Sequence, residues 1–100
     1  MFIVMLKFAD NRAEAGRHMD GHKAWIARGF EDGVFLMVGS LVPGLGGAVI
    51  AHATTRADLQ ARVEADPFVV ENVVTAEILE IDPARADERL GFLLNAPAAA

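Results

Sequence analysis

Two residues of this sequence could together carry out proton transfer: His22 and Asp66. His22 belongs to an apolar stripe that recurs at helical spacing through residues 15–30, so we expect its ring to point inward. Burial disfavours a charged imidazolium unless a carboxylate lies nearby. Asp66 is expected to end a second helix, where a carboxylate faces the negative end of the helix dipole and needs a partner. An Asp–His pair fixes the ring for acid or base catalysis, which is the chemistry we expect.

The same pair has a purely structural interpretation. A hydrogen bond between His22 and Asp66 would close the turn that leads from the second helix into the next strand. Ionisable groups that depart from their usual behaviour are often structural rather than catalytic. Both interpretations therefore stay open at the level of the sequence.

Three further residues are candidates for substrate binding. Ser40 follows Gly39 at the expected end of a strand and could bind a substrate oxygen, although it could equally bond its own backbone. No G-x-S-x-G motif surrounds Ser40, so we expect no serine nucleophile. Trp25 and Phe68 are expected in the core or along the wall of a small apolar cleft.

Metal binding is not expected. His18 and His22 are four residues apart on one helical face, a spacing that can hold a metal ion. A metal site needs a third or fourth ligand, and neither an H-E-x-x-H motif nor any cysteine accompanies this pair. We therefore predict no metal site.

The elements that position these residues are predicted in the order β-α-β-β-α-β, followed by a short helix. Apolar runs of strand formers predict the strands, and a 3.6-residue period with capping residues predicts the helices. Asn11 with Glu14 resembles a capping box, and Thr55 is expected to cap the second helix. The predicted strands are 2–8, 34–41, 48–53 and 69–81, and the predicted helices are 11–32, 55–66 and a short one that begins at 82–83. This order is that of a ferredoxin-like α+β domain, with an antiparallel sheet and helices on one face.

The second face of the predicted sheet is too apolar for a monomer. Strands 2–8 and 34–38 are apolar at nearly every position, whereas a sheet that is covered on one face should alternate. An uncovered apolar face of this size is unusual on a soluble monomer. We therefore expect a homodimer in which two sheets pack face to face.

Composition limits the class of protein further. The chain has 100 residues, enough for one domain, which we place at 1–95 with a disordered tail at 96–100. The net charge is −5 and the nine Lys and Arg are scattered, so no nucleic-acid partner is expected. No apolar run reaches the ~18 residues of a membrane span, and no signal peptide is recognisable. We expect a cytoplasmic protein without a membrane partner.

Several short motifs strengthen these expectations when they are taken together. They are His22-Lys23-Ala24-Trp25, Gly33, Gly39-Ser40, Gly46-Gly47 and Asp66-Pro67-Phe68. In this combination the sequence resembles the YCII-related (YciI-like) family of the dimeric α+β barrel superfamily. The resemblance implies a ferredoxin-like fold, a homodimer and a pocket in which His22 and Asp66 form the active site.

The resemblance also implies a class of function. Most members of the family have no assigned reaction, and related proteins act on small, often aromatic or lactone-like metabolites without a cofactor. We therefore expect elimination, isomerisation or hydrolysis of a small molecule by His22 and Asp66, with Ser40, Trp25 and Phe68 binding the substrate. Ser40 departs from the family pattern, because many members carry proline at that position. The alternative is a dimeric module that binds a small ligand without turning it over.

Overall fold

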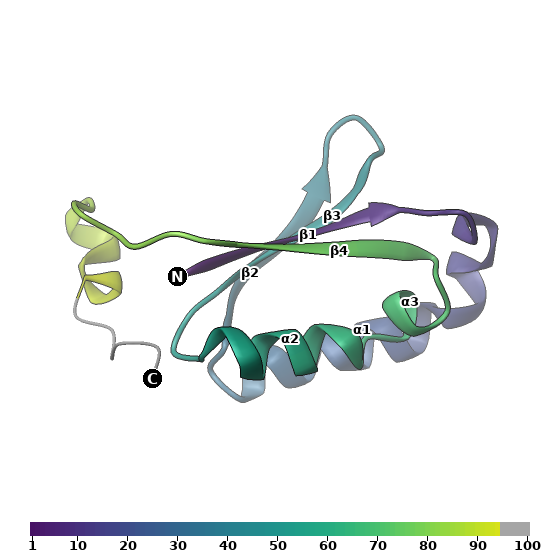
Figure 1. Ribbon diagram of the computed structural model, residues 1–100, viewed down its shortest axis with the longest axis horizontal. Coiled ribbons are helices and arrows are strands. Elements are labelled where there is room, and N and C mark those ends of the chain that lie inside the picture. Colours follow the sequence, from purple (N-terminus) through teal and green to yellow (C-terminus); the bar gives the residue numbers. More distant parts are fainter. Residues whose placement is uncertain (95–100) are drawn as a thin grey trace.

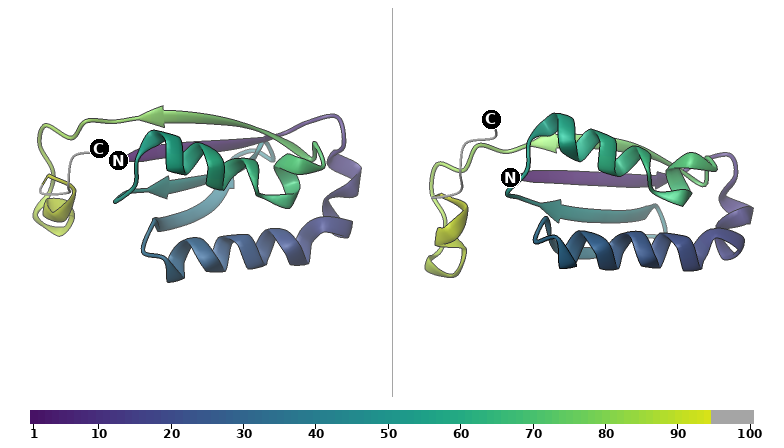
Figure 2. Two further views of the ribbon diagram at one scale, coloured as in Figure 1. Left: turned by 60° about the horizontal axis from the view of Figure 1, so that its bottom comes forward. Right: turned by 90° about the horizontal axis from the view of Figure 1, so that it is seen from below.

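Four antiparallel strands form one sheet in the order β2-β3-β1-β4, and the helices α1, α2 and α3 pack on one of its faces (Figures 1 and 2). This computed structural model describes residues 1–94; the tail predicted at 96–100 lies outside the described residues. The order of elements confirms the ferredoxin-like α+β fold. The elements are β1 (Phe2–Phe8), the 3-10 helix η1 (Arg12–Glu14), α1 (Ala15–Glu31), β2 (Phe35–Leu41), β3 (Gly46–Ala51), α2 (Arg56–Glu64), α3 (Pro67–Val70), β4 (Val74–Glu80) and the 3-10 helix η2 (Glu88–Leu93).

The central strand β1 divides its side chains between the two faces of the sheet. Phe2, Val4 and Leu6 are buried beneath the helices, whereas Ile3 and Met5 lie on the opposite face and are only half-buried. The pairing of β1 with β3 and β4 extends this division across the sheet, because directly paired residues share a face. The sheet therefore has one helix-covered face and one open face.

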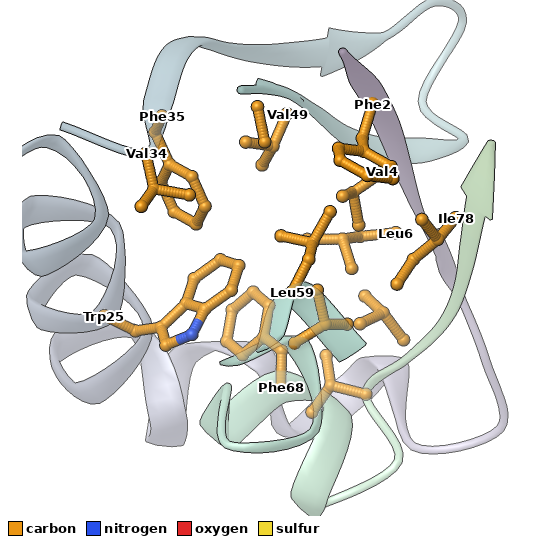
Figure 3. Close-up of a cluster of buried hydrophobic side chains, with 14 residues drawn as sticks. Phe2, Val4, Leu6, Trp25, Val34, Phe35, Val49, Leu59, Phe68 and Ile78 are labelled. Atoms are coloured by element: carbon orange, nitrogen blue, oxygen red, sulfur yellow. The ribbon is translucent and has the colours of Figure 1, made fainter. Parts of the chain in front are cut away.

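The core lies between the helix-covered face and the helices (Figure 3). Trp25 from α1 and Phe68 from α3 approach each other at its lower side, and Leu59 from α2 is fully buried beside the strands. Trp25 also packs edge-on against Phe35 of β2, with ring centroids 5.0 Å apart. These aromatic contacts join α1, α3 and the edge strand around one apolar interior.

The predicted start of the first helix is wrong in its details. Asn11 makes no capping hydrogen bond; its side-chain amide donates instead to the carbonyl of Glu71 across the domain. The chain passes through η1 before α1 begins at Ala15. The cap of the second helix is confirmed, because the Thr55 hydroxyl accepts from the Asp58 backbone N–H at 3.0 Å.

The segment after the second helix also differs from the prediction. Residues 69–73 were expected at the start of the last strand because valines favour strands, but Pro67–Val70 form α3 and β4 begins only at Val74. Proline is well suited to the first position of a helix, and Asp66 caps it. The terminal helix likewise begins later than predicted, at Glu88 after a cap by Asp87.

The β2–β3 hairpin is confirmed, with bounds that shift by two residues in β3. It spans Gly46–Ala51 instead of 48–53. A bulge between Phe35 and Met37 changes the alternation of β2, so that Ser40 pairs with Gly47 on the helix-covered face. The Ser40 hydroxyl at the end of β2 therefore lies on the side of the sheet that faces α1.

Candidate functional site

His22 and Asp66 are in direct contact. Nδ1 of His22 lies 2.8 Å from Oδ1 of Asp66, and the two side chains are 14% and 0% exposed. The same Oδ1 accepts a hydrogen bond from the Phe68 backbone N–H at 3.0 Å. The second helix was expected to end near Asp66, and α2 ends at Glu64. Asp66 itself is the N-cap of the next helix, α3.

The ring of His22 is held flat as well as hydrogen-bonded. It stacks on Phe68 with centroids 3.9 Å apart and an interplanar angle of 3°, and Trp25 lies on a nearly parallel plane at 5.8 Å. An ionised carboxylate only accepts, so Nδ1 carries the proton that is donated to Asp66. In that tautomer the lone pair of the ring is on Nε2, which makes no hydrogen bond within residues 1–94.

The carboxylate of Asp66 depends strongly on this partner. Its Oδ2 is buried and has no hydrogen-bond partner among residues 1–94. A buried carboxylate is costly unless it is paired and hydrogen-bonded. His22 supplies the one side-chain donor that Asp66 has within the described chain, so the two groups stabilise each other.

A pocket of about 310 Å³ lies between α1 and the helix-covered face of the sheet. His22, Trp25 and Phe68 contribute to one side of it, and Ser40 contributes from the end of β2. Asp66 is not a lining residue and lies behind His22. The structure thus brings four of the five predicted site residues to one pocket and places the fifth in contact with them.

Comparison with known proteins identifies one family. The sequence profile of the YCII-related domain matches residues 1–82. The chain belongs to the YCII-related family. The match spans β1 to β4 and includes all five predicted site residues, whereas η2 lies beyond it. No curated protein and no solved structure matches the chain significantly.

The walls of the pocket in this YCII-related domain are mainly apolar. Trp25 is fixed by a hydrogen bond from its Nε1 to the carbonyl of Arg62 at 2.9 Å. The Ser40 side chain is exposed and makes no hydrogen bond within residues 1–94. A hydroxyl without an internal partner on the wall of an apolar pocket is suited to bind a polar atom of a ligand.

Sequence reasoning missed one polar residue of the pocket. Lys23 lines it beside His22, although the apolar stripe of α1 gave no reason to place Lys23 inward. The one available signal was its position next to His22 in the motif that resembles the YCII-related family.

The spacing of His18 and His22 does not build a wider cluster in this YCII-related domain. Within residues 1–94 no three His, Asp or Glu side chains gather closely enough to hold a metal ion. No helix of the described chain is long and apolar enough to cross a membrane.

Proposed function

We propose that this YCII-related protein is an enzyme in which His22 moves a proton to or from a small organic molecule in the pocket, without a cofactor. The observation that carries the proposal is the 2.8 Å contact between His22 Nδ1 and the buried Asp66. In this contact Nδ1 is bonded to Asp66, and Nε2 is the ring nitrogen that would contact the substrate. This is the usual preparation of a histidine for general acid–base catalysis.

The surroundings of His22 suit a reaction in which a proton leaves or joins carbon or oxygen. Eliminations, isomerisations and hydrolyses all need such a step, and general acid–base catalysis typically contributes ~10²–10⁴-fold to it. In this proposal His22 transfers the proton and Asp66 holds the ring. Ser40 donates to a substrate oxygen, while Trp25 and Phe68 form apolar walls around the substrate.

A non-catalytic ligand-binding module is the second candidate. Asp66 caps α3 as well as binding His22, so this carboxylate has a structural role that needs no reaction. In a module the pocket would bind its ligand with no turnover, and His22 would serve only packing and recognition.

We also propose that two copies of the chain associate through the open face of the sheet. Met37 is 56% exposed and Leu79 41% exposed on this face, and Ile3, Met5 and Ile50 are half-buried between them. Contiguous apolar side chains of this kind mark interaction surfaces. A second sheet of the same sequence would cover them and leave the pockets, which lie on the other face, accessible.

Turnover of a panel of small metabolites by the wild type and His22→Ala tests the proposed activity. We expect His22→Ala to lose about 100-fold or more in kcat/KM while retaining its circular dichroism spectrum. His18→Ala is the matched control, because His18 lies one turn away on α1 and does not line the pocket. Tight binding without turnover by the wild type would favour the module instead, and unchanged turnover in His22→Ala would exclude the proposed role.

A further inference from the structure

We propose that the pocket is specific for a small apolar molecule that carries one carboxylate, and that Lys23 binds this carboxylate. The inference rests on the proposed function and names the substrate class of the same site. It depends on three observations: the charges at the pocket, the size and chemistry of its walls, and the polar groups that have no internal partner.

The charge at the pocket is positive although the chain as a whole is acidic. Lys23 and His22 are the ionisable side chains among the lining residues, and no Asp or Glu belongs to the lining. The net charge of the chain is −5, so this absence of acids is local. Asp66 contacts the pocket only through His22, since its side chain is fully buried. An anion in the pocket is therefore attracted by the Lys23 ammonium and is not repelled by a carboxylate among the lining residues.

Lys23 is available to bind such an anion. Its ammonium forms no ion pair with any carboxylate in residues 1–94. Asp20, the acid nearest to it along α1, is exposed to solvent and does not line the pocket. Lys23 is itself largely exposed, so its long side chain can place the charge over the mouth of the pocket without a desolvation cost.

The apolar walls define the rest of the ligand. A cavity of ~150 Å³ holds one benzene molecule, so about 310 Å³ has room for one ring with a short substituent. Phe8, Trp25, Ile26, Val49 and Phe68 supply apolar contact on several sides. A ligand that places its hydrocarbon part against these walls and its carboxylate at Lys23 brings the carbons between them within reach of Nε2 of His22.

A single carboxylate fits this site better than a phosphate. Phosphate sites typically offer several donors, from a helix N-terminus, a glycine-rich loop or arginine forks. Lys23 and Ser40 carry the side-chain donors of the lining that have no partner within residues 1–94, since the N–H of His22 faces Asp66 and Nε1 of Trp25 donates to Arg62, and no Arg lines the pocket. A donor set this small suits a single carboxylate better than a phosphate.

Matched acid and amide pairs test this substrate class. Binding of benzoate and benzamide, phenylacetate and phenylacetamide, and cinnamate and cinnamamide can be followed by the fluorescence of Trp25, the single tryptophan of the chain. We expect at least one acid to bind about fivefold more tightly than its amide, the size typical of a partly exposed ion pair. Lys23→Gln should reduce this preference to within about twofold. Arg28→Gln, which removes a charge from the same helix outside the pocket lining, should preserve it.

The outcomes separate this inference from the proposed function. A wild type that binds no acid more tightly than its amide, or a Lys23→Gln variant that keeps the full preference, would overturn the inference without affecting turnover by His22. His22→Ala is expected to keep the preference for the acid while losing turnover. If it keeps both, the proposed acid–base role is wrong and the carboxylate site stands.

Discussion

At the scale of single residues, Asp66 joins the fold to the site. One of its oxygens accepts both the backbone N–H of Phe68 and the imidazole N–H of His22. The first bond starts α3, and the second orients the ring whose other nitrogen is free. Asp66 thus caps a helix and also holds His22. For this reason the structural and the catalytic interpretation of the sequence both apply to His22 and Asp66.

The two tasks of Asp66 can be separated by substitution. Asp66→Asn retains an oxygen that can accept from Phe68, but it removes the negative charge that orients His22. We expect kcat/KM to decrease about 100-fold, with a change of less than about 2 kcal/mol in the free energy of unfolding. Asp66→Ala, which removes both bonds, should lose activity and about 1–3 kcal/mol of stability in urea denaturation. Full activity in Asp66→Asn would contradict an orienting role for the carboxylate.

The residues of the site differ in how far the sequence predicts them. His22 was placed correctly because the helical period of α1 is regular and determines which residues face inward. Lys23 was missed because it lies next to the apolar stripe of α1 and not within it. Its place in the pocket lining depends on how α1 packs against the sheet, which the sequence pattern does not determine. Ser40 faces α1 because of a bulge in β2, which the sequence does not reveal.

At the scale of elements, the close contact of α1 with α3 positions His22 and Asp66. The sequence suggests that Gly21, inside the first helix, allows close backbone packing, and Pro67 of α3 is the group it approaches. A Cβ built on Gly21 would lie 3.0 Å from Cγ of Pro67. Gly21 precedes His22 and Pro67 follows Asp66, so this contact lies beside the pair and affects the separation of the two side chains.

Gly21→Ala should therefore affect activity more than stability. The added methyl group requires the Pro67 ring to shift by a few tenths of an ångström, while alanine stabilises the helix by up to about 1 kcal/mol. We expect kcat/KM to decrease about fivefold with little change in Tm, since catalysis is sensitive to small displacements. In Gly16→Ala, where no atom lies within 4 Å of the built Cβ, activity should stay unchanged. Equal activity of the two variants would show that this contact does not position the site.

The elements also show where prediction from the sequence stops. The strands, their order and the two long helices follow from apolar periodicity and from turn residues. The short helix α3 was missed because its valines favour a strand, whereas Pro67 occupies the first position of a helix that Asp66 caps. Asn11 fits a capping box in sequence, but in the folded domain its amide bonds Glu71 across the structure. A contact between distant segments decided the second case.

At the scale of the whole molecule, the open face of the sheet determines the expected assembly. Its exposed Met37 and Leu79 and its half-buried Ile3, Met5 and Ile50 agree with the lack of alternation in the sequence. The homodimer itself stays a prediction. It rests on the cost of leaving such a surface in contact with water, about 25 cal/mol per Å² of apolar area.

A charge at the centre of the open face should break the dimer. Ile50 pairs with Ile3 on one side and Met37 on the other, so Ile50→Lys would bury an unpaired ammonium in the interface. We expect the wild type to sediment as a dimer, and the Kd of dimerisation to rise about 100-fold or more in this variant. Val42→Lys is the control, because Val42 is 84% exposed in the β2–β3 loop. A wild type that sediments as a monomer even at high concentration would refute the assembly.

The most direct test of the whole account is the protonation of the two ring nitrogens of His22, measured by ¹⁵N NMR in alkaline buffer where the ring is neutral. We expect a proton on Nδ1, donated to Asp66, and a bare Nε2 whose chemical shift changes when a carboxylate ligand binds in the pocket. A neutral ring with its proton on Nε2, or an Nε2 signal that no bound ligand alters, would contradict the claim that His22 is a base directed at the pocket.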